Sequence, residues 1–169
     1  EGPIVERFRM NIIKDDAARV AALRDGRADI AIFYRPDAMT LLSEVPNVEA
    51  VLQQTTNYYR IDFNAIWEGS PFRDARLRQA VNMAIDRQQI AEIALAGASV
   101  VDYPVPIAFS SAKGCRSIPS YERDLDRARA LVKEAGAEGM TVDLIASPDE
   151  YALPFIAQVI QANLAEIGL

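Results

Sequence analysis

In residues 1–34, two segments have the apolar pattern of a strand and the stretch between them has that of an amphipathic helix. This order predicts a strand, a helix and a second strand. Segments 5–13 ("VERFRMNII") and 28–34 ("ADIAIFY") have the apolar pattern of buried strands. Between them lies an amphipathic stretch, which Asp15 or Asp16 would cap as a helix and Gly26 would end. The order predicts a β-α-β unit with parallel strands.

The next part of the chain predicts a short helix and two further strands. The helix starts at Pro36 or Asp37 and ends near Ser43, and the strands cover 48–54 and 57–67. Along the second of these strands, two different sets of side chains alternate, as expected for a strand whose two faces have different surroundings. Its two alternating sets are Tyr59, Ile61 and Phe63 on one side and Tyr58, Arg60 and Asp62 on the other.

The rest of the chain predicts mostly helix, with one long loop and one more strand. The helices are expected at 74–85, 86–95, 124–136 and 151–168, and the strand at 140–147. Segment 100–124 is rich in Pro, Ser and Gly and predicts a long loop, a feature that is often functional. Strands that alternate with helices in this way predict the α/β class.

Composition and charge narrow the range of functions. The chain has 169 residues with a net charge of −6, and its arginines are dispersed along the sequence. Nucleic-acid binding needs clustered Lys and Arg, so the sequence predicts no nucleic-acid partner. No apolar run reaches the roughly 20 residues of a membrane-spanning helix.

The side chains that most enzymes use are scarce. There is no histidine, so Ser110 and Ser111 have no imidazole to activate them, and Cys115 is the single cysteine. The adjacent acids Asp15 and Asp16 are more typical of a helix cap than of a catalytic pair. The sequence therefore predicts no catalytic residue, no metal site and no cofactor, and the protein is not expected to be an enzyme.

Several stretches occur in an order that resembles a known family. They are "DDAARVAALRDGRADIAIF", "NYYRIDFN", "PFRDARLRQAVNMAIDRQQI", "YERDLDRARALVKEAGA", "MTVDLIASPDEY" and "IAQVIQANLAEIGL". Together they resemble the extracytoplasmic solute-binding proteins of ABC importers, family 5, which bind oligopeptides, dipeptides and nickel chelates. The third stretch is the most specific. The resemblance covers essentially the whole chain, and because the family's proteins are much longer, it implies an internal fragment.

The resemblance implies part of a two-lobed, type II periplasmic-binding-protein fold, in which mixed sheets are flanked by helices. Residues 1–56 would be a segment contributed to the first lobe. Residues 57–64 would be the strand that crosses the hinge, and 65–169 would be the first part of the second lobe. In such a fold the lobes close on the ligand like a clamp.

The resemblance also implies a role as the substrate-binding component of an ABC transporter. The partners would be a peptide or similar solute and the membrane permease subunits, in the periplasm or another extracytoplasmic location. A lipid or membrane anchor before Glu1 is left open, and the isolated fragment is expected to self-associate through exposed core. The alternative is a ligand-sensing or structural domain of a regulatory protein with the same fold, which an upstream helix-turn-helix would favour over a signal peptide.

Polar residues of the most specific stretch have a scaffold role in this interpretation. Asp74 and Asp86 are expected to cap helices. Arg76, Arg78 and Arg87 are expected to be surface or ion-pairing residues.

Three stretches are expected to face the ligand cleft. The crossing strand offers aromatic side chains and backbone groups for an added strand, and two loops offer apolar walls and carboxylates. The last loop follows a predicted strand, where α/β folds favour ligand sites. Aromatic residues on a strand can equally belong to the core. The candidate residues are Asn57, Tyr58, Tyr59, Tyr103, Phe109, Asp149, Glu150 and Tyr151.

Overall fold

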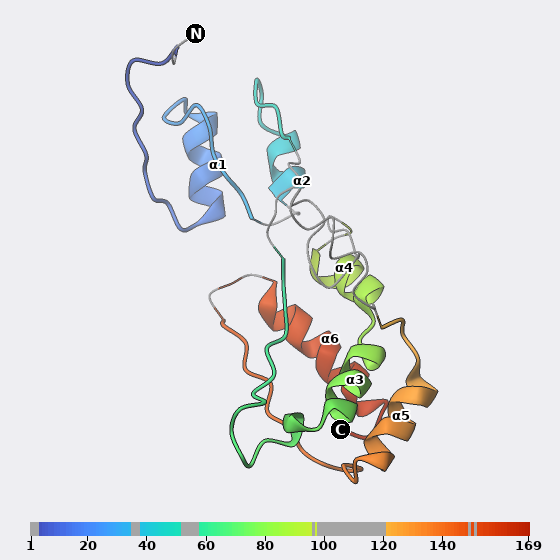
Figure 1. The fold of residues 1–169 in the computed structure, drawn as a ribbon. Helices are drawn as coiled ribbons and strands as arrows, with labels where there is room; N and C mark the ends of the chain where they lie inside the picture. Colours follow the sequence, from blue (N-terminus) through green and yellow to red (C-terminus); the bar gives the residue numbers. More distant parts are fainter. Residues whose placement is uncertain are drawn as a thin grey trace. The chain divides into compact units, whose positions relative to one another are not determined.

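The computed structural model describes residues 4–34, 38–51, 58–95, 97, 121–148, 150 and 152–169. The chain divides into two compact units, residues 1–52 and 53–169 (Figure 1). Each unit has a hydrophobic core of its own. None of the helices in the described ranges is long and apolar enough to cross a membrane.

The first unit is built on two helices, α1 (Asp16–Arg24) and α2 (Ala38–Ser43). The Asp15 side chain accepts a hydrogen bond from the Ala18 N–H at 2.8 Å and caps α1, as the sequence predicts. The core of this unit is small. It consists of Val20, Leu42 and Val45, with Leu23, Phe33, Val48 and Ala50 packed against them.

Arg19 on α1 connects the extended segments on either side of the helix. Its guanidinium donates hydrogen bonds to the backbone carbonyl oxygens of Lys14 and Ile32. It also pairs with Asp16 at 2.5 Å and lies 5.2 Å from the centre of the Phe33 ring. One side chain therefore binds a carbonyl group of the predicted strand 28–34 and another just after the predicted strand 5–13.

The predicted strands are extended, but the described residues contain no hydrogen-bonded β-strand, so the mixed sheets are not confirmed. A strand needs a neighbour to satisfy its backbone groups, and these segments have none among the described residues. Their apolar side chains are accordingly exposed: Phe8 is 76% exposed, Ile30 is 81% exposed and Ile145 is 93% exposed.

The second unit has four α-helices within the described residues and one short 3₁₀ turn, η1 (Pro71–Arg73). The α-helices are α3 (Ala75–Ala84), α4 (Arg87–Leu95), α5 (Leu125–Glu134) and α6 (Leu153–Ala165). The sequence predicts all four of these helices. Gly97, Gly136 and Gly168, at or just beyond helix ends, have positive φ angles.

Helices α3 and α5 pack closely against each other (Figure 1). The residues between them are small or compact, and Ala80, Ala84 and Ala128 are completely buried. The Asp124 N–H donates to the Met83 carbonyl at 3.0 Å at one end. At the other end, Arg76 Nη1 donates to the Glu134 carbonyl at 2.8 Å. Each bond joins the start of one helix to the end of the other, so the pair is antiparallel.

Asn163 on α6 is the one buried polar side chain that joins α6 to α4 in the described structure. Its Oδ1 accepts the Asp86 N–H at 2.8 Å, and its Nδ2 donates to Gln89 Oε1 at 3.3 Å. Asp86 in turn caps α4 by accepting the Gln89 N–H at 2.9 Å. Arg123 completes the group, because its guanidinium lies 3.6 Å from Asp86 and 3.0 Å from Glu166.

The polar residues of the stretch 70–87 hold its two helices in place. Asp74 caps α3 through the Arg76 N–H at 2.9 Å, and hydrogen bonds from Arg76 lower the pKa of Asp74 to about 2. Arg78 and Arg87 differ from the expected surface or ion-pairing role. Both are partly buried and donate to backbone carbonyl groups, Arg78 to Phe72 at 2.6 Å and Arg87 to Asn82 at 3.1 Å.

The α3–α5 contact yields a test of packing. Ala128→Leu is expected to lower the free energy of unfolding of the second unit by about 1–3 kcal/mol, because the extra methylene groups have no space between the helices. Urea denaturation followed by circular dichroism measures this. Ala162→Leu on the exposed face of α6 is the matched control, with a change within about 0.5 kcal/mol. Equal effects of both substitutions would contradict the close packing.

The buried amide yields a second test. Asn163→Ala is expected to cost about 1–3 kcal/mol, because the Asp86 N–H loses its acceptor away from water. Gln89→Ala removes only the longer 3.3 Å bond at an exposed residue and is expected to cost less. The same urea measurement compares them, and an Asn163→Ala variant as stable as Gln89→Ala would show that the amide does not matter.

Candidate functional site

Two predicted ligand residues, Tyr58 and Tyr59, lie on an extended segment of the second unit. Further along this segment, Ile61 and Phe63 pack against the helical core, which fixes the orientation of the backbone. The tyrosine side chains remain accessible, with Tyr58 54% exposed and Tyr59 46% exposed. Two phenol rings are thus available to solvent at the start of a well-anchored segment.

Tyr59 is within the electrostatic influence of Glu150, another predicted ligand residue. Partial burial first, and then the negative charge of Glu150, raise the pKa of the Tyr59 phenol above its usual value. The Glu150 side chain is exposed, and its carbonyl accepts the Leu153 N–H at 3.1 Å, just at the start of α6. A carboxylate in this position is favoured by the positive end of the helix dipole.

On the side of this extended segment opposite to Ile61 and Phe63, Arg60 and Asp62 form a polar pair. Arg60 Nε donates to both carboxylate oxygens of Asp62, at 3.0 and 3.1 Å. Asp62 first, and Tyr58 second, raise the pKa of the Arg60 guanidinium. The two-faced pattern that the sequence predicts is therefore present, with Ile61 and Phe63 inward and Arg60 and Asp62 exposed.

The other five predicted ligand residues lie outside the described residues. They are Asn57, Tyr103, Phe109, Asp149 and Tyr151. Among the described residues, a charge effect therefore links Tyr59 with Glu150, and Tyr58 precedes Tyr59 in the chain. A phenol and a carboxylate can bind a solute by hydrogen bonds, ring stacking and charge.

Trp67, at the end of the predicted strand 57–67, is largely exposed to solvent. Its ring is 65% exposed and lies against the backbone of Gly69. A Cβ atom on Gly69 would come within 2.9 Å of the ring, so only glycine fits beneath it without a shift.

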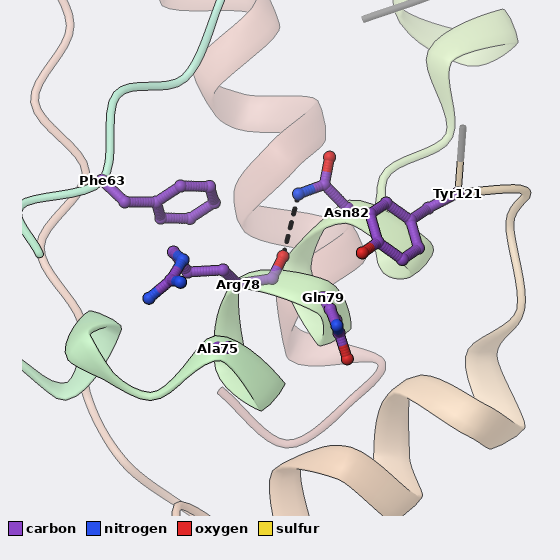
Figure 2. A pocket seen from close by; sticks show the side chains of 6 residues that line it. All are labelled: Phe63, Ala75, Arg78, Gln79, Asn82 and Tyr121. Atoms are coloured by element: carbon purple, nitrogen blue, oxygen red, sulfur yellow. Dashed lines mark hydrogen bonds between the residues drawn. The ribbon is translucent and has the colours of Figure 1, made fainter. Parts of the chain in front are cut away.

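A hollow that the sequence analysis does not identify lies on α3, away from its core face. It has a volume of about 270 Å³. Figure 2 shows Phe63 and Tyr121 on opposite sides of it and the polar side chains of α3 between them. Its lining consists of Phe63, Ala75, Arg78, Gln79, Asn82 and Tyr121.

The sequence does contain a signal for this hollow. Ala75, Arg78, Gln79 and Asn82 follow the spacing of a second helix face, beside the apolar face of α3. Asn82 Nδ2 donates to the Arg78 carbonyl at 2.9 Å, as drawn in Figure 2. Its Oδ1 accepts from Arg87 at 3.1 Å, so the Asn82 amide is held in one orientation.

Comparison with known proteins places the whole chain in one family. Residues 1–169 match the sequence model of the bacterial extracellular solute-binding proteins, family 5, middle region. The heme-binding protein A of Haemophilus influenzae is 29% identical over 171 residues, which cover 98% of this chain and 30% of that protein.

Two other relatives have different ligands in their names. The glutathione-binding protein GsiB of Salmonella typhimurium is 29% identical over 169 residues, covering 99% of this chain and 32% of that protein. The dipeptide-binding protein of Pseudomonas aeruginosa is 30% identical over 172 residues, covering 98% and 31%. The chain thus spans about a third of the length of the curated relatives it matches. It belongs to the bacterial extracellular solute-binding proteins of family 5.

Proposed function

We propose that this chain is part of the substrate-binding component of an ABC importer, which captures a peptide or a similar small solute and delivers it to a membrane permease. The observation that carries this proposal is the family match over all 169 residues. Relatives named for dipeptides, glutathione and heme support a small solute as the ligand. The role requires selective binding and release, and it needs no catalytic residue.

Family membership implies a two-lobed type II fold for the full-length protein. Residues 1–56 would belong to the first lobe, 57–64 would cross the hinge, and 65–169 would begin the second lobe. The division of the chain into units 1–52 and 53–169 supports this assignment. The extended segments that lack neighbours would then be strands of the mixed sheets, completed by other parts of the protein.

Within this fold, Tyr58 and Tyr59 would contact the ligand from the hinge-crossing strand, and Glu150 would contact it from the second lobe. The exposure of the two phenol rings and the electrostatic influence of Glu150 on Tyr59 support the assignment. Asn57, Tyr103, Phe109, Asp149 and Tyr151 complete the proposed site on sequence grounds. The tyrosines would stack on apolar parts of the solute, and the carboxylates would accept hydrogen bonds from its amino groups.

The ligand class can be tested on the full-length protein by thermal denaturation with a panel of dipeptides, tripeptides, glutathione, nickel chelates and heme. A ligand of the native state is expected to stabilise it by about 2.7 kcal/mol at a hundredfold excess over its Kd, which raises the Tm. Tyr59→Ala is expected to reduce the shift, whereas Trp67→Ala, outside the proposed site, is the control and should keep it. A panel in which no solute changes the Tm would falsify the importer role for these ligand classes.

The Tyr59–Glu150 pair has a pH signature of its own. Because the folded-state pKa of Tyr59 is raised, the folded state keeps this proton after the unfolded state has lost it. The free energy of unfolding should therefore fall as the pH rises above about 10, the usual pKa of tyrosine. Glu150→Gln should move the Tyr59 pKa back toward 10 without reaching it, because burial is the larger cause.

The measurement is an NMR titration of the Tyr59 ring in the wild type, in Glu150→Gln and in the control Glu138→Gln. Glu138 is exposed and does not contribute to the raised pKa of Tyr59. A Tyr59 pKa that is the same in all three proteins would show that the two groups are not close.

A further inference from the structure

We propose that Phe72 is a positioning residue for the proposed solute site. Its ring sets the direction of the segment that carries Tyr58 and Tyr59, and Arg78 holds Phe72 in place. The part of this inference that concerns solute binding rests on the proposed function. Three features of the second unit carry it, namely a ring contact, a hydrogen-bonded turn and a guanidinium group with a fixed position.

The ring contact joins the tyrosine-bearing segment to the start of α3. The ring centres of Phe63 and Phe72 are 5.1 Å apart, and the ring planes are tilted by 47°. Aromatic pairs prefer tilted or offset arrangements at such a separation, so the contact favours one direction of approach. Ile61 also packs against the helical core, but an aliphatic contact has no preferred direction. The ring pair is therefore the more directional of the two contacts.

The turn between the two rings is closed by hydrogen bonds between near neighbours in the chain. The N–H groups of Ala65, Trp67 and Ser70 donate to acceptors two or three residues earlier, at 2.9, 3.3 and 3.0 Å. Bonds of this kind let a turn hold its own shape. A displacement of Phe72 is therefore passed on to Phe63 through a turn that has little freedom to absorb it.

Phe72 is itself fixed from two sides. The hydroxyl of the buried Ser70 accepts the Phe72 N–H at 3.2 Å. From α3, Arg78 Nη1 donates to the carbonyl groups of Phe72 at 2.6 Å and Arg73 at 3.1 Å. Figure 2 shows Arg78 and Phe63 on the same side of the hollow that both of them line. The position of the ring pair thus follows from that of α3.

The distance between the ring pair and the tyrosines makes this direction important. Residues of an extended chain rise by about 3.3 Å each, so Tyr59 lies about 13 Å from Phe63 along the segment. A rotation of about 10° at Phe63 would move Tyr59 by about 2 Å. The groups of a binding site need to lie within about 0.5 Å of their productive positions. The contact that fixes the direction of the segment therefore decides whether the tyrosines can meet a solute.

The test uses the full-length protein, so that any strand that pairs with the segment is present. Residual dipolar couplings of the backbone N–H groups, measured by NMR, give the direction of residues 58–63 relative to α3 and α5. Phe72→Ala is expected to change this direction, so that these couplings no longer fit the wild-type orientation while those of the helices still do. Phe72→Tyr keeps the ring and is expected to keep the wild-type couplings.

The same variants are compared in solute binding, with glutathione and alanylalanine as the probes. Phe72→Ala is expected to raise the Kd of a probe that the wild type binds by at least about tenfold, because its tyrosines are no longer held in position. Leu125→Ala on α5 is the matched control. It truncates another partly buried side chain of the same core, at the far end of α3 from Phe72. It is expected to lower the Tm but to keep the wild-type couplings and Kd.

Arg78→Met tests the second link and serves if Phe72→Ala does not fold. It keeps a long side chain but removes the donor to the Phe72 and Arg73 carbonyl groups, and it is expected to change the couplings of residues 58–63 as well. Arg87→Met removes a bond of the same kind, to the Asn82 carbonyl at the other end of α3, and is the control with wild-type couplings.

Wild-type couplings of residues 58–63 in both Phe72→Ala and Arg78→Met would overturn the proposal. Equal changes in Leu125→Ala would also overturn it, because a general loss of core packing would then be the cause. Changed couplings with an unchanged Kd would overturn the role in solute binding. A wild type that binds neither probe would count against the proposed function instead, and the couplings would still decide whether Phe72 directs the segment.

Discussion

The second unit depends on the close contact between α3 and α5. Ala80, Ala84 and Ala128 are completely buried there, and small side chains are what allow two helix backbones to approach. Because the two helices are joined at both ends by hydrogen bonds, α3 cannot rotate without breaking them. The direction in which the other face of α3 points, and with it the hollow, follows from this one contact.

The helices could be predicted from the sequence because their signals are local. Asp15, Asp74 and Asp124 each accept a backbone N–H in the first turn of a helix, and such caps can be read from a few neighbouring residues. Strand pairing could not be predicted in this way, because a ladder of hydrogen bonds between strands needs a partner strand that is distant in the chain. The role of Arg19, which holds two carbonyl groups 18 residues apart (Lys14 and Ile32), has no local signal at all.

The candidate site residues show the same contrast between local and long-range signals. The proximity of Tyr59 and Glu150 involves residues far apart in sequence, and only the resemblance to a family, rather than any spacing, could suggest it. The hollow on α3 has a local pattern, but its aromatic sides come from two other segments, at Phe63 and Tyr121. The partly buried positions of Arg78 and Arg87 could not be predicted either, because both guanidinium groups bind backbone carbonyls, and a sequence does not show which carbonyl groups will lie within their reach.

The anchoring of Asp124 and Arg123 has a consequence for how this protein can diverge. Asp124 is fixed to the end of α3 through Met83, and Arg123 is fixed to Asp86 and Glu166. The point at which the connection between α4 and α5 enters α5 is therefore fixed by the helices. Doubling the length of such a connection costs only about 0.6 kcal/mol of loop-closure entropy. A change in the length of this connection alone therefore alters the entropy of loop closure little, while Asp124 and Arg123 keep the start of α5 in place.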